Sequence, residues 1–184
     1  MMNKTMQRFC AVVLICALFL AGKSQAAEVD ALYDKMGIVK PRTEKTAPDF
    51  SLKTLDGRSV KLSEFKGKPV LLNFWATWCE ACKKEMPSMQ RLYDRLAEQG
   101  IEVIAVSIDR KNKDRVEDFV TSHALSFPIL LDQSQEVRRK YFILGLPTSY
   151  LIGPDFKLKG YASGARAWDH PDLVRILEAL NNHS

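Results

Sequence analysis

Hydrophobic residues along this chain fall into runs and repeats that predict alternating strands and helices. Two almost continuous apolar runs, residues 69–76 and 101–108, are typical of strands that are covered on both faces. Between them, apolar residues recur at three- and four-residue steps over residues 86–96, which predicts an amphipathic helix ending at Gly100. Pro87 lies inside this predicted helix and should kink it, because proline removes a backbone hydrogen bond.

Shorter patterns on either side predict the rest of the fold. Residues 47–52 and 59–62 alternate between apolar and polar, and the Asp-Gly pair at residues 56–57 predicts a hairpin between them. Further along, the pattern predicts helices over residues 114–124, 135–142 and 171–180, and strands over residues 127–131, 148–152 and 157–161. This order predicts an α/β fold with a mixed central sheet, helices on both faces and its first two long strands parallel.

The N-terminal 26 residues have a different pattern. A short basic segment, residues 1–8, precedes an apolar stretch of 14 residues, Phe9 to Gly22. That stretch is shorter than the roughly 20 residues that span a bilayer as a helix. Small residues at Ser24 and Ala26 suit cleavage after Ala26, so we expect residues 1–26 to be a secretory signal peptide. An uncleaved N-terminal anchor is the alternative.

Charge and length indicate one exported domain. The chain has 184 residues, 27 of them basic and 22 acidic, but residues 1–26 hold three of the basic residues and no acidic one. The remainder is therefore nearly neutral, and we expect no nucleic-acid partner. We interpret residues 27–45 as a linker with one short helix around residues 31–36, and residues 46–184 as a single domain.

The candidate chemistry lies in residues 78–82, Trp-Cys-Glu-Ala-Cys, where a buried strand gives way to a helix. Unpaired N–H groups and the positive end of the helix dipole favour a thiolate there, and the thiolate is the attacking species in disulfide exchange. Two intervening residues let one helical turn bring the sulfurs of Cys79 and Cys82 together. The pattern predicts a thiol–disulfide exchange site in which Cys79 attacks and Cys82 resolves. The other cysteines, Cys10 and Cys16, belong to the predicted leader, and export places the remaining pair where disulfides persist.

Three other interpretations of the pair remain. A structural zinc site needs a second pair of ligands, and the three histidines are scattered, so we predict no metal. An inert structural disulfide usually closes a longer loop. Two reduced core cysteines would not explain the flanking tryptophans or the helix start. We therefore predict no cofactor besides a redox-active disulfide between Cys79 and Cys82.

Residues 73–82, Asn-Phe-Trp-Ala-Thr-Trp-Cys-Glu-Ala-Cys, resemble the active-site segment of thioredoxin-fold proteins. More narrowly, they resemble the exported thiol–disulfide oxidoreductases of the TlpA/ResA type. These proteins also have an Ala-Pro-Asp-Phe segment, here residues 47–50, before an N-terminal hairpin, and an extra helix and strand in mid-domain, here residues 114–131. The resemblance covers about residues 46–180 and implies a thioredoxin fold with a protein-disulfide reductase activity.

The resemblance implies further site residues. Pro147 matches the family's cis-proline, which faces the disulfide, and the backbone of Leu146 could then pair with an incoming peptide. We expect Trp75, Trp78 and Pro147 to form an apolar rim on which the substrate lies.

Glu85 matches an acidic residue that lies near the thiols in many ResA-like members. Asn73 stands where thioredoxin has a buried acid, and asparagine cannot titrate. A partly buried Glu85 would have a raised pKa and could accept the proton of Cys82. The alternative for Glu85 is a solvent-facing helix residue paired with arginine or lysine. Glu80, between the cysteines, should raise the thiol pKa by repulsion.

The two glutamates also bear on the direction of electron flow. A stable thiolate makes a dithiol oxidising, and Glu80 and Glu85 oppose it, which favours a reductase. The resemblance implies the same direction, with electrons from a membrane thiol carrier and with apocytochrome c as a possible substrate in cytochrome c maturation, in the periplasm or at the extracytoplasmic face of the membrane. Alternatives are a disulfide oxidase or isomerase, a peroxidase, a copper-delivery protein and a binding module. The chain lacks a Pro-x-x-x-Thr-x-x-Cys peroxidase arrangement, and its cysteine spacing is one residue short of the copper-delivery pattern.

Overall fold

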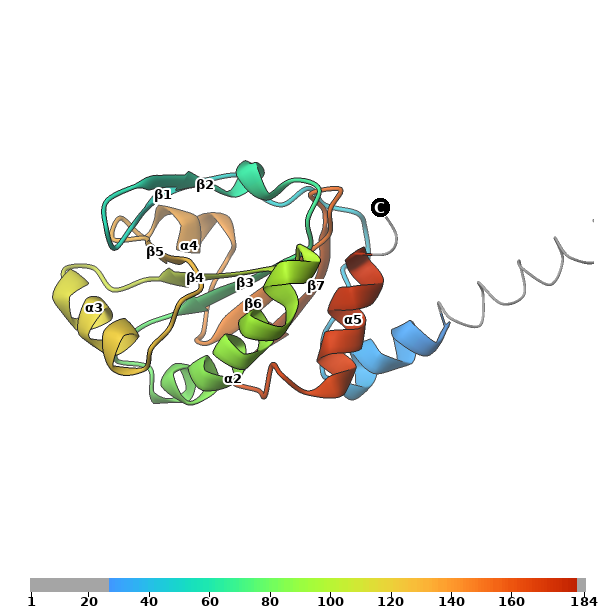
Figure 1. Ribbon diagram of the computed structural model, residues 1–184. Coiled ribbons are helices and arrows are strands. Elements are labelled where there is room, and N and C mark those ends of the chain that lie inside the picture. Colours follow the sequence, from blue (N-terminus) through green and yellow to red (C-terminus); the bar gives the residue numbers. More distant parts are fainter. Residues whose placement is uncertain (1–26, 182–184) are drawn as a thin grey trace, which may run out of the picture.

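A mixed seven-stranded sheet organises the part of the chain that the computed structural model describes, residues 27–181 (Figure 1). The strands are β1 (Ser51–Thr54), β2 (Ser59–Lys61), β3 (Val70–Trp75), β4 (Glu102–Ser107), β5 (Ile129–Leu131), β6 (Thr148–Ile152) and β7 (Leu158–Ser163). The helices are α2 (Glu80–Leu96), α3 (Lys113–Ser122), α4 (Glu136–Lys140) and α5 (Pro171–Asn181), with 3₁₀ turns η1 (Leu62–Phe65) and η2 (Ala97–Gln99). Across the sheet the order is β2-β1-β5-β4-β3-β6-β7.

The centre of the sheet is parallel and its margins are antiparallel. β3 pairs in parallel with β4, as the crossover rule predicts, and β4 pairs in parallel with β5. β6 joins the other side of β3 antiparallel and forms the predicted antiparallel pair with β7. Every residue of β3 is buried, which explains why its sequence is a continuous apolar run with a single polar residue.

Alternating side chains of β3 show that helices cover both faces. The ring centroids of Trp75 and Phe119 in α3 lie 5.2 Å apart, and Asn73 on the same face donates to Glu85 in α2. Phe74 points the other way, and its ring centroid lies 5.3 Å from that of Tyr141, which follows α4. The mixed sheet with helices on both faces is therefore confirmed, and so is the mid-domain helix and strand, which are α3 and β5.

The N-terminal hairpin is present but begins later than the sequence predicts. β1 starts at Ser51 rather than residue 47, because Ala47 donates its N–H to the carbonyl of Phe156 (2.9 Å) instead of joining the ladder. The turn at residues 56–57 is confirmed: Gly57 has φ +87°, in the left-handed region that glycine adopts readily.

Residues 27–45 contain the predicted short helix, but they pack on the domain and so correct the linker prediction. Residues 27–35 are helical, and Tyr33 and Ile38 are 3% and 2% exposed. A Cβ on Gly160 in β7 would come within 2.6 Å of Ile38, so the strand admits this segment only because it has glycine there. The helix lies beside α5 (Figure 1), where Lys35 forms a 2.6 Å ion pair with Asp172. The segment is thus part of the domain, whereas the predicted leader lies outside the described residues.

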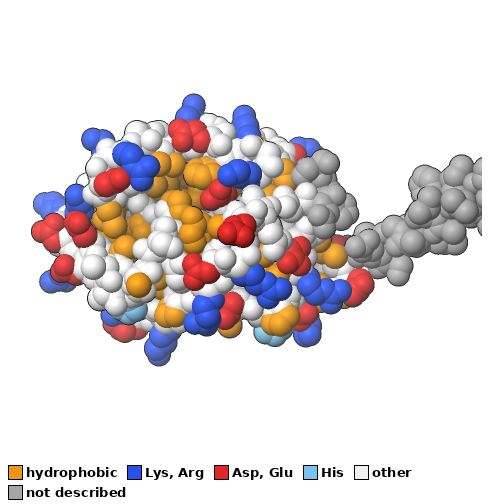
Figure 2. Space-filling view, in the orientation of Figure 1, with side chains coloured by type: hydrophobic (Ala, Val, Ile, Leu, Met, Phe, Trp, Pro, Cys, Tyr) orange, Lys and Arg blue, Asp and Glu red, His pale blue; other side chains and the backbone are white. Residues whose placement is uncertain are grey.

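The surface of the domain carries both charged and hydrophobic side chains. Charges of both signs are interspersed around a group of hydrophobic side chains on the face shown in Figure 2. Over residues 27–181, the structure contains no helix with both the length and the apolar character needed to cross a membrane.

Candidate functional site

The cysteine pair lies where the chain leaves β3 and enters α2. Cys79 is the N-cap of α2, and its sulfur accepts a hydrogen bond from the backbone N–H of Cys82 (3.2 Å). The N–H of Cys79 itself donates to the carbonyl of Ala76 (3.1 Å), which closes the turn before the helix. The sulfur of Cys79 therefore faces the positive end of the α2 dipole, the environment that the sequence predicts for a thiolate.

The two sulfurs differ in their access to solvent. They form a disulfide with an S–S distance of 2.08 Å and a Cα–Cα distance of 5.3 Å. Cys79 is 9% exposed and Cys82 is fully buried. A partner thiol can therefore reach only Cys79 without rearrangement, which agrees with the predicted division between attacking and resolving cysteine. Trp78, immediately before Cys79, is 65% exposed and offers an apolar surface next to the accessible sulfur.

Asp109 holds the loop that carries Cys79. Its two carboxylate oxygens accept hydrogen bonds from the N–H (3.0 Å) and the hydroxyl (2.7 Å) of Thr77, and a third comes from the hydroxyl of Ser107 (2.8 Å). Sequence reasoning missed this residue. The available signal was its place just after a buried run, because parallel neighbours such as β3 and β4 end at the same edge of a sheet.

Glu85 is buried one helical turn after Cys82. It is 2% exposed, which rules out the solvent-facing alternative. Its Oε1 accepts from Nδ2 of Asn73 (2.8 Å), and its Oε2 accepts from Nε1 of Trp168 (3.1 Å) and from the N–H of Arg166 (3.2 Å). Burial raises the pKa of Glu85 to about 7, although these hydrogen bonds and the nearby Arg166 charge oppose the rise. The burial and the raised pKa agree with the prediction; the catalytic role stays a prediction.

A buried polar network supports Glu85, and the sequence did not indicate most of it. Asn73 Nδ2 also donates to the hydroxyl of Ser149 (2.9 Å). The hydroxyl of Ser88 donates to the Glu85 carbonyl (2.7 Å) and accepts from the N–H of Trp168 (3.0 Å). Glu85 also borders a cleft of about 290 Å³ between α2 and residues 165–167.

Pro147 follows a cis peptide bond, as the resemblance implies. The Leu146–Pro147 peptide bond is cis, and the carbonyl of Pro147 accepts from the N–H of Gly164 (2.9 Å). Phe74 pairs with Thr148, so Pro147 lies next to the end of β3, from which the cysteine loop departs. Pro147 is buried and Leu146 is half-buried.

The structure contradicts the prediction for Trp75 and modifies the one for Glu80. Trp75 is fully buried against α3, so its assignment to the substrate rim is wrong: it is still a residue of β3, and its side chain points to the face that α3 covers. The Glu80 carboxylate is exposed and forms a 2.5 Å ion pair with Lys83. This neighbouring positive charge weakens the repulsion that we expected Glu80 to exert on the thiols.

Comparisons with known proteins agree with this geometry. The family model described as "AhpC/TSA family" matches residues 43–160. The chain is 35% identical over 177 residues to the thiol-disulfide oxidoreductase ResA of Geobacillus thermodenitrificans, covering 96% of this chain and 98% of that protein. It is 37% identical over 160 residues to ResA of Bacillus subtilis, covering 83% and 80% of the two chains. Among solved structures, a putative thiol:disulfide interchange protein DsbE from Chlorobium tepidum matches with a TM-score of 0.70 at 32% identity, over 78% of this chain and 99% of that one.

Proposed function

From the premise that the chain belongs to the AhpC/TSA family and to the ResA-type thiol–disulfide oxidoreductases, we propose that it reduces disulfides of substrate proteins outside the cytoplasm. The observation that carries the proposal is the asymmetry of the pair. Cys79 reaches solvent at a helix start, while Cys82 is buried one turn from a carboxyl group with a pKa of about 7.

The reduced form starts the reaction. The Cys79 thiolate attacks one sulfur of the substrate disulfide, the other substrate sulfur leaves as a thiolate, and a mixed disulfide joins Cys79 to the substrate. The Cys82 thiol then loses its proton, and its thiolate attacks the Cys79 sulfur. The second substrate sulfur leaves, the substrate holds two thiols, and the enzyme holds the Cys79–Cys82 disulfide. Two electrons have passed from the enzyme to the substrate.

Glu85 is the proton acceptor for Cys82 in this scheme. A carboxyl group with a pKa of about 7 is partly ionised at neutral pH, so it can take the thiol proton and release it again. Both side chains lie on the same side of α2, because residues three apart on a helix are neighbours. Glu85 then releases the proton to water through the cleft that it borders.

Direction and partners follow from the same residues and from the resemblance. The buried Glu85 carboxylate disfavours a stable thiolate pair, which supports a reducing dithiol. We propose a membrane thiol carrier as the electron donor that reduces the Cys79–Cys82 disulfide, and apocytochrome c as a substrate during cytochrome c maturation. The predicted leader supports a location in the periplasm or at the extracytoplasmic face of the membrane.

A trapping experiment tests the assignment. Cys82→Ser should accumulate a mixed disulfide through Cys79 with a disulfide-containing substrate such as insulin, and Cys79→Ser is the matched control. A trap through Cys82 in the control would reverse the roles. The reduction potential tests the direction, because a value near −120 mV, about that of a strong oxidase, contradicts a reductase.

A peroxidase is a second candidate because of the family model that matches residues 43–160. The buried Cys82 beside an accessible Cys79 suits exchange with a partner disulfide better. Consumption of hydrogen peroxide at the rate of insulin reduction would favour the peroxidase. Within residues 27–181, the structure contains no group of three or more histidine, cysteine, aspartate or glutamate residues placed to hold a metal.

A further inference from the structure

A cleft of about 510 Å³ lies at the same edge of the sheet as the disulfide, and the proposed chemistry does not use it. Its lining residues are Arg110, Gln135, Arg138, Arg139, Phe142, Ile143 and Leu144. Arg110 directly follows Asp109, which holds the loop of Cys79, and Leu144 precedes the cis-proline loop by two residues. Both walls of the cleft therefore continue into segments that flank the reactive sulfur.

One wall presents apolar side chains to solvent. Phe142 is 84% exposed and Leu144 is 95% exposed, whereas Ile143 between them is 4% exposed and anchors the turn. The turn is fixed by backbone hydrogen bonds from Phe142 to Arg139 (3.1 Å) and from Ile143 to Arg138 (3.0 Å). Phe142 has φ +53°, a left-handed conformation that is unusual for a bulky residue. The fold thus holds two large apolar side chains in water at a defined position, which is typical of a contact surface.

Within residues 27–181, the arginines of the other wall form no ion pair with a carboxylate. Arg138 donates to the Ile143 carbonyl (3.2 Å) and to Gln135 Oε1 (3.3 Å), and Arg139 donates to the Ser134 carbonyl (3.3 Å). All of these acceptors are uncharged, and within residues 27–181 Arg110 has no ion-pair partner.

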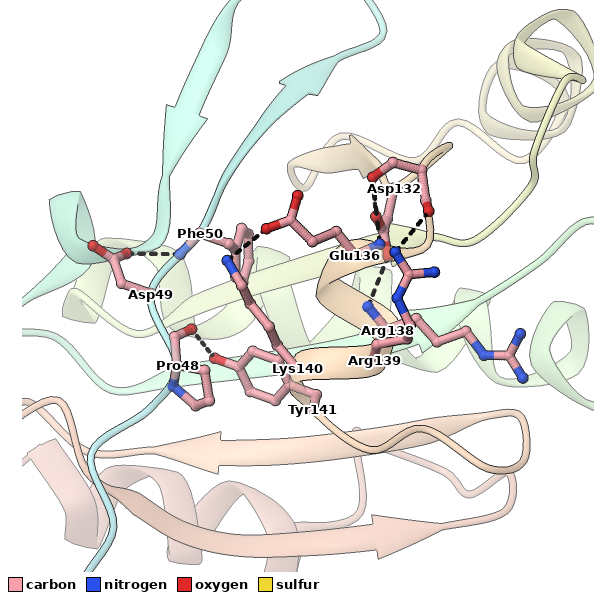
Figure 3. A network of polar contacts seen from close by, with 10 residues as sticks. Pro48, Asp49, Phe50, Asp132, Glu136, Arg138, Arg139, Lys140 and Tyr141 are labelled. Atoms are coloured by element: carbon pink, nitrogen blue, oxygen red, sulfur yellow. Dashed lines mark hydrogen bonds and ion pairs between the residues drawn. The ribbon is translucent and has the colours of Figure 1, made fainter.

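The acids of α4 and its preceding turn are engaged elsewhere. Asp132 accepts from the backbone N–H of Arg138 (2.7 Å), and Glu136 pairs with Lys140 (2.8 Å), although its charge also acts on Arg139. Figure 3 shows the arginine side chains on the side of α4 away from Tyr141, whose hydroxyl is bound to Pro48. The cleft therefore combines a positive charge that is only partly balanced with exposed apolar surface.

We propose that this cleft binds a segment of the substrate protein that carries carboxylates next to an apolar side chain. The inference rests on the proposed function and names the chemistry of the substrate segment that lies beside the target disulfide. Arginine guanidinium groups bind carboxylates through two parallel hydrogen bonds, and Phe142 and Leu144 supply the contact for the apolar side chain. The hollow shape favours an inserted peptide over the flat surface of an anionic membrane.

Two peptides test the proposal with the reduced protein. Each contains one intramolecular disulfide and differs only in the flanking residues, Asp-Leu-Asp or Lys-Leu-Lys. We expect the acidic peptide to have a kcat/KM about tenfold higher at low salt, because opposite charges speed encounter. The preference should fall below about threefold in 0.5 M salt, where exposed charges are screened.

Variants locate the preference in the cleft. The double substitution Arg110→Glu and Arg139→Glu should reverse the preference, whereas Arg42→Glu with Arg95→Glu, an equal change of net charge at other exposed positions, should keep it. Leu144→Ser should lower the rate on the acidic peptide about threefold, and Val39→Ser is the control at another exposed apolar side chain.

Three results would overturn the proposal in distinguishable ways. Equal rates on both peptides would refute the cleft and leave the proposed function standing. Failure of the wild-type protein to reduce either peptide would refute the function and the cleft together. Binding to phosphatidylglycerol vesicles that the Arg110→Glu and Arg139→Glu variant loses, with equal peptide rates, would identify the surface as a membrane contact.

Discussion

Replacing Glu85 with glutamine should make the oxidised protein more stable at neutral pH than at acidic pH, relative to the wild type. Burial raises the pKa of Glu85 from 4.5 to about 7. Below pH 4.5 the carboxyl group is protonated in both the folded and the unfolded chain. As pH rises, the unfolded chain loses the proton first, so the wild-type folded state loses stability through this window and carries the full cost above pH 7. The amide of Glu85→Gln does not titrate and avoids that cost.

The magnitude follows from the size of the shift. A difference of about 2.5 pKa units corresponds to about 3 kcal/mol, of which about 1 kcal/mol is present at pH 5 and nearly all at pH 8. The amide also places an N–H₂ group where the carboxylate accepted hydrogen bonds from Asn73 or Trp168. That mismatch costs about 1–2 kcal/mol at every pH. The pH dependence of the difference, rather than its absolute size, therefore reports the burial of the charge.

Urea unfolding of both oxidised proteins at pH 5, 6, 7 and 8 measures the difference. We expect the free energy of unfolding of Glu85→Gln minus that of the wild type to rise by about 2 kcal/mol from pH 5 to pH 8. Glu80→Gln is the matched control, because it makes the same substitution at an exposed glutamate on the same helix, where the charge is not buried. A flat difference for Glu85→Gln would show that the carboxyl group titrates normally and would remove the basis for its role as proton acceptor.

Three further predictions test the loop, the rim and the N-terminal segment. Asp109→Asn weakens the hydrogen bonds to Thr77 and should lower the free energy of unfolding by about 1–3 kcal/mol and shift the reduction potential of the cysteine pair; an unchanged potential would limit Asp109 to a structural role. Trp78→Ala should lower kcat/KM for insulin about tenfold while the free energy of unfolding changes by less than about 0.5 kcal/mol, and equal kinetics would exclude Trp78 from the substrate contact. Ile38→Ala should cost about 2–4 kcal/mol in urea unfolding, whereas a linker residue would cost less than about 0.5 kcal/mol.

The sequence predicted the sheet, the helices and the reactive pair because these depend on local patterns. The continuous apolar run of β3 and the three- and four-residue repeat of α2 each identify an element without knowledge of its partners. The N-cap position of Cys79 follows from where these two elements meet. The burial of Trp75 could not be predicted in the same way, because the element that covers it, α3, lies about 40 residues later.

The segment 27–45 was misjudged for a related reason. Its apolar residues are too few for a periodic signal, and their burial depends on the absence of a side chain at Gly160, more than 100 residues away. No local pattern in either segment indicates the other. The same holds for Asp109, whose bonds to Thr77 exist only because β3 and β4 end at the same edge.

Glu85 shows that the reactivity of the site belongs to the whole domain and not to the cysteine motif alone. Its carboxylate is held from β3 by Asn73 and from the loop before α5 by Trp168 and the backbone of Arg166. The guanidinium of Arg166 in turn donates to the carbonyl of Met36 (2.7 Å), just after the N-terminal helix. The segment that leads from the predicted leader into the domain is therefore bonded to the residue whose N–H donates to Glu85. The N-terminal segment thus contacts Arg166, which bonds to Glu85, so a part of the chain without predicted site residues lies two hydrogen bonds from the carboxyl group that we propose as the proton acceptor.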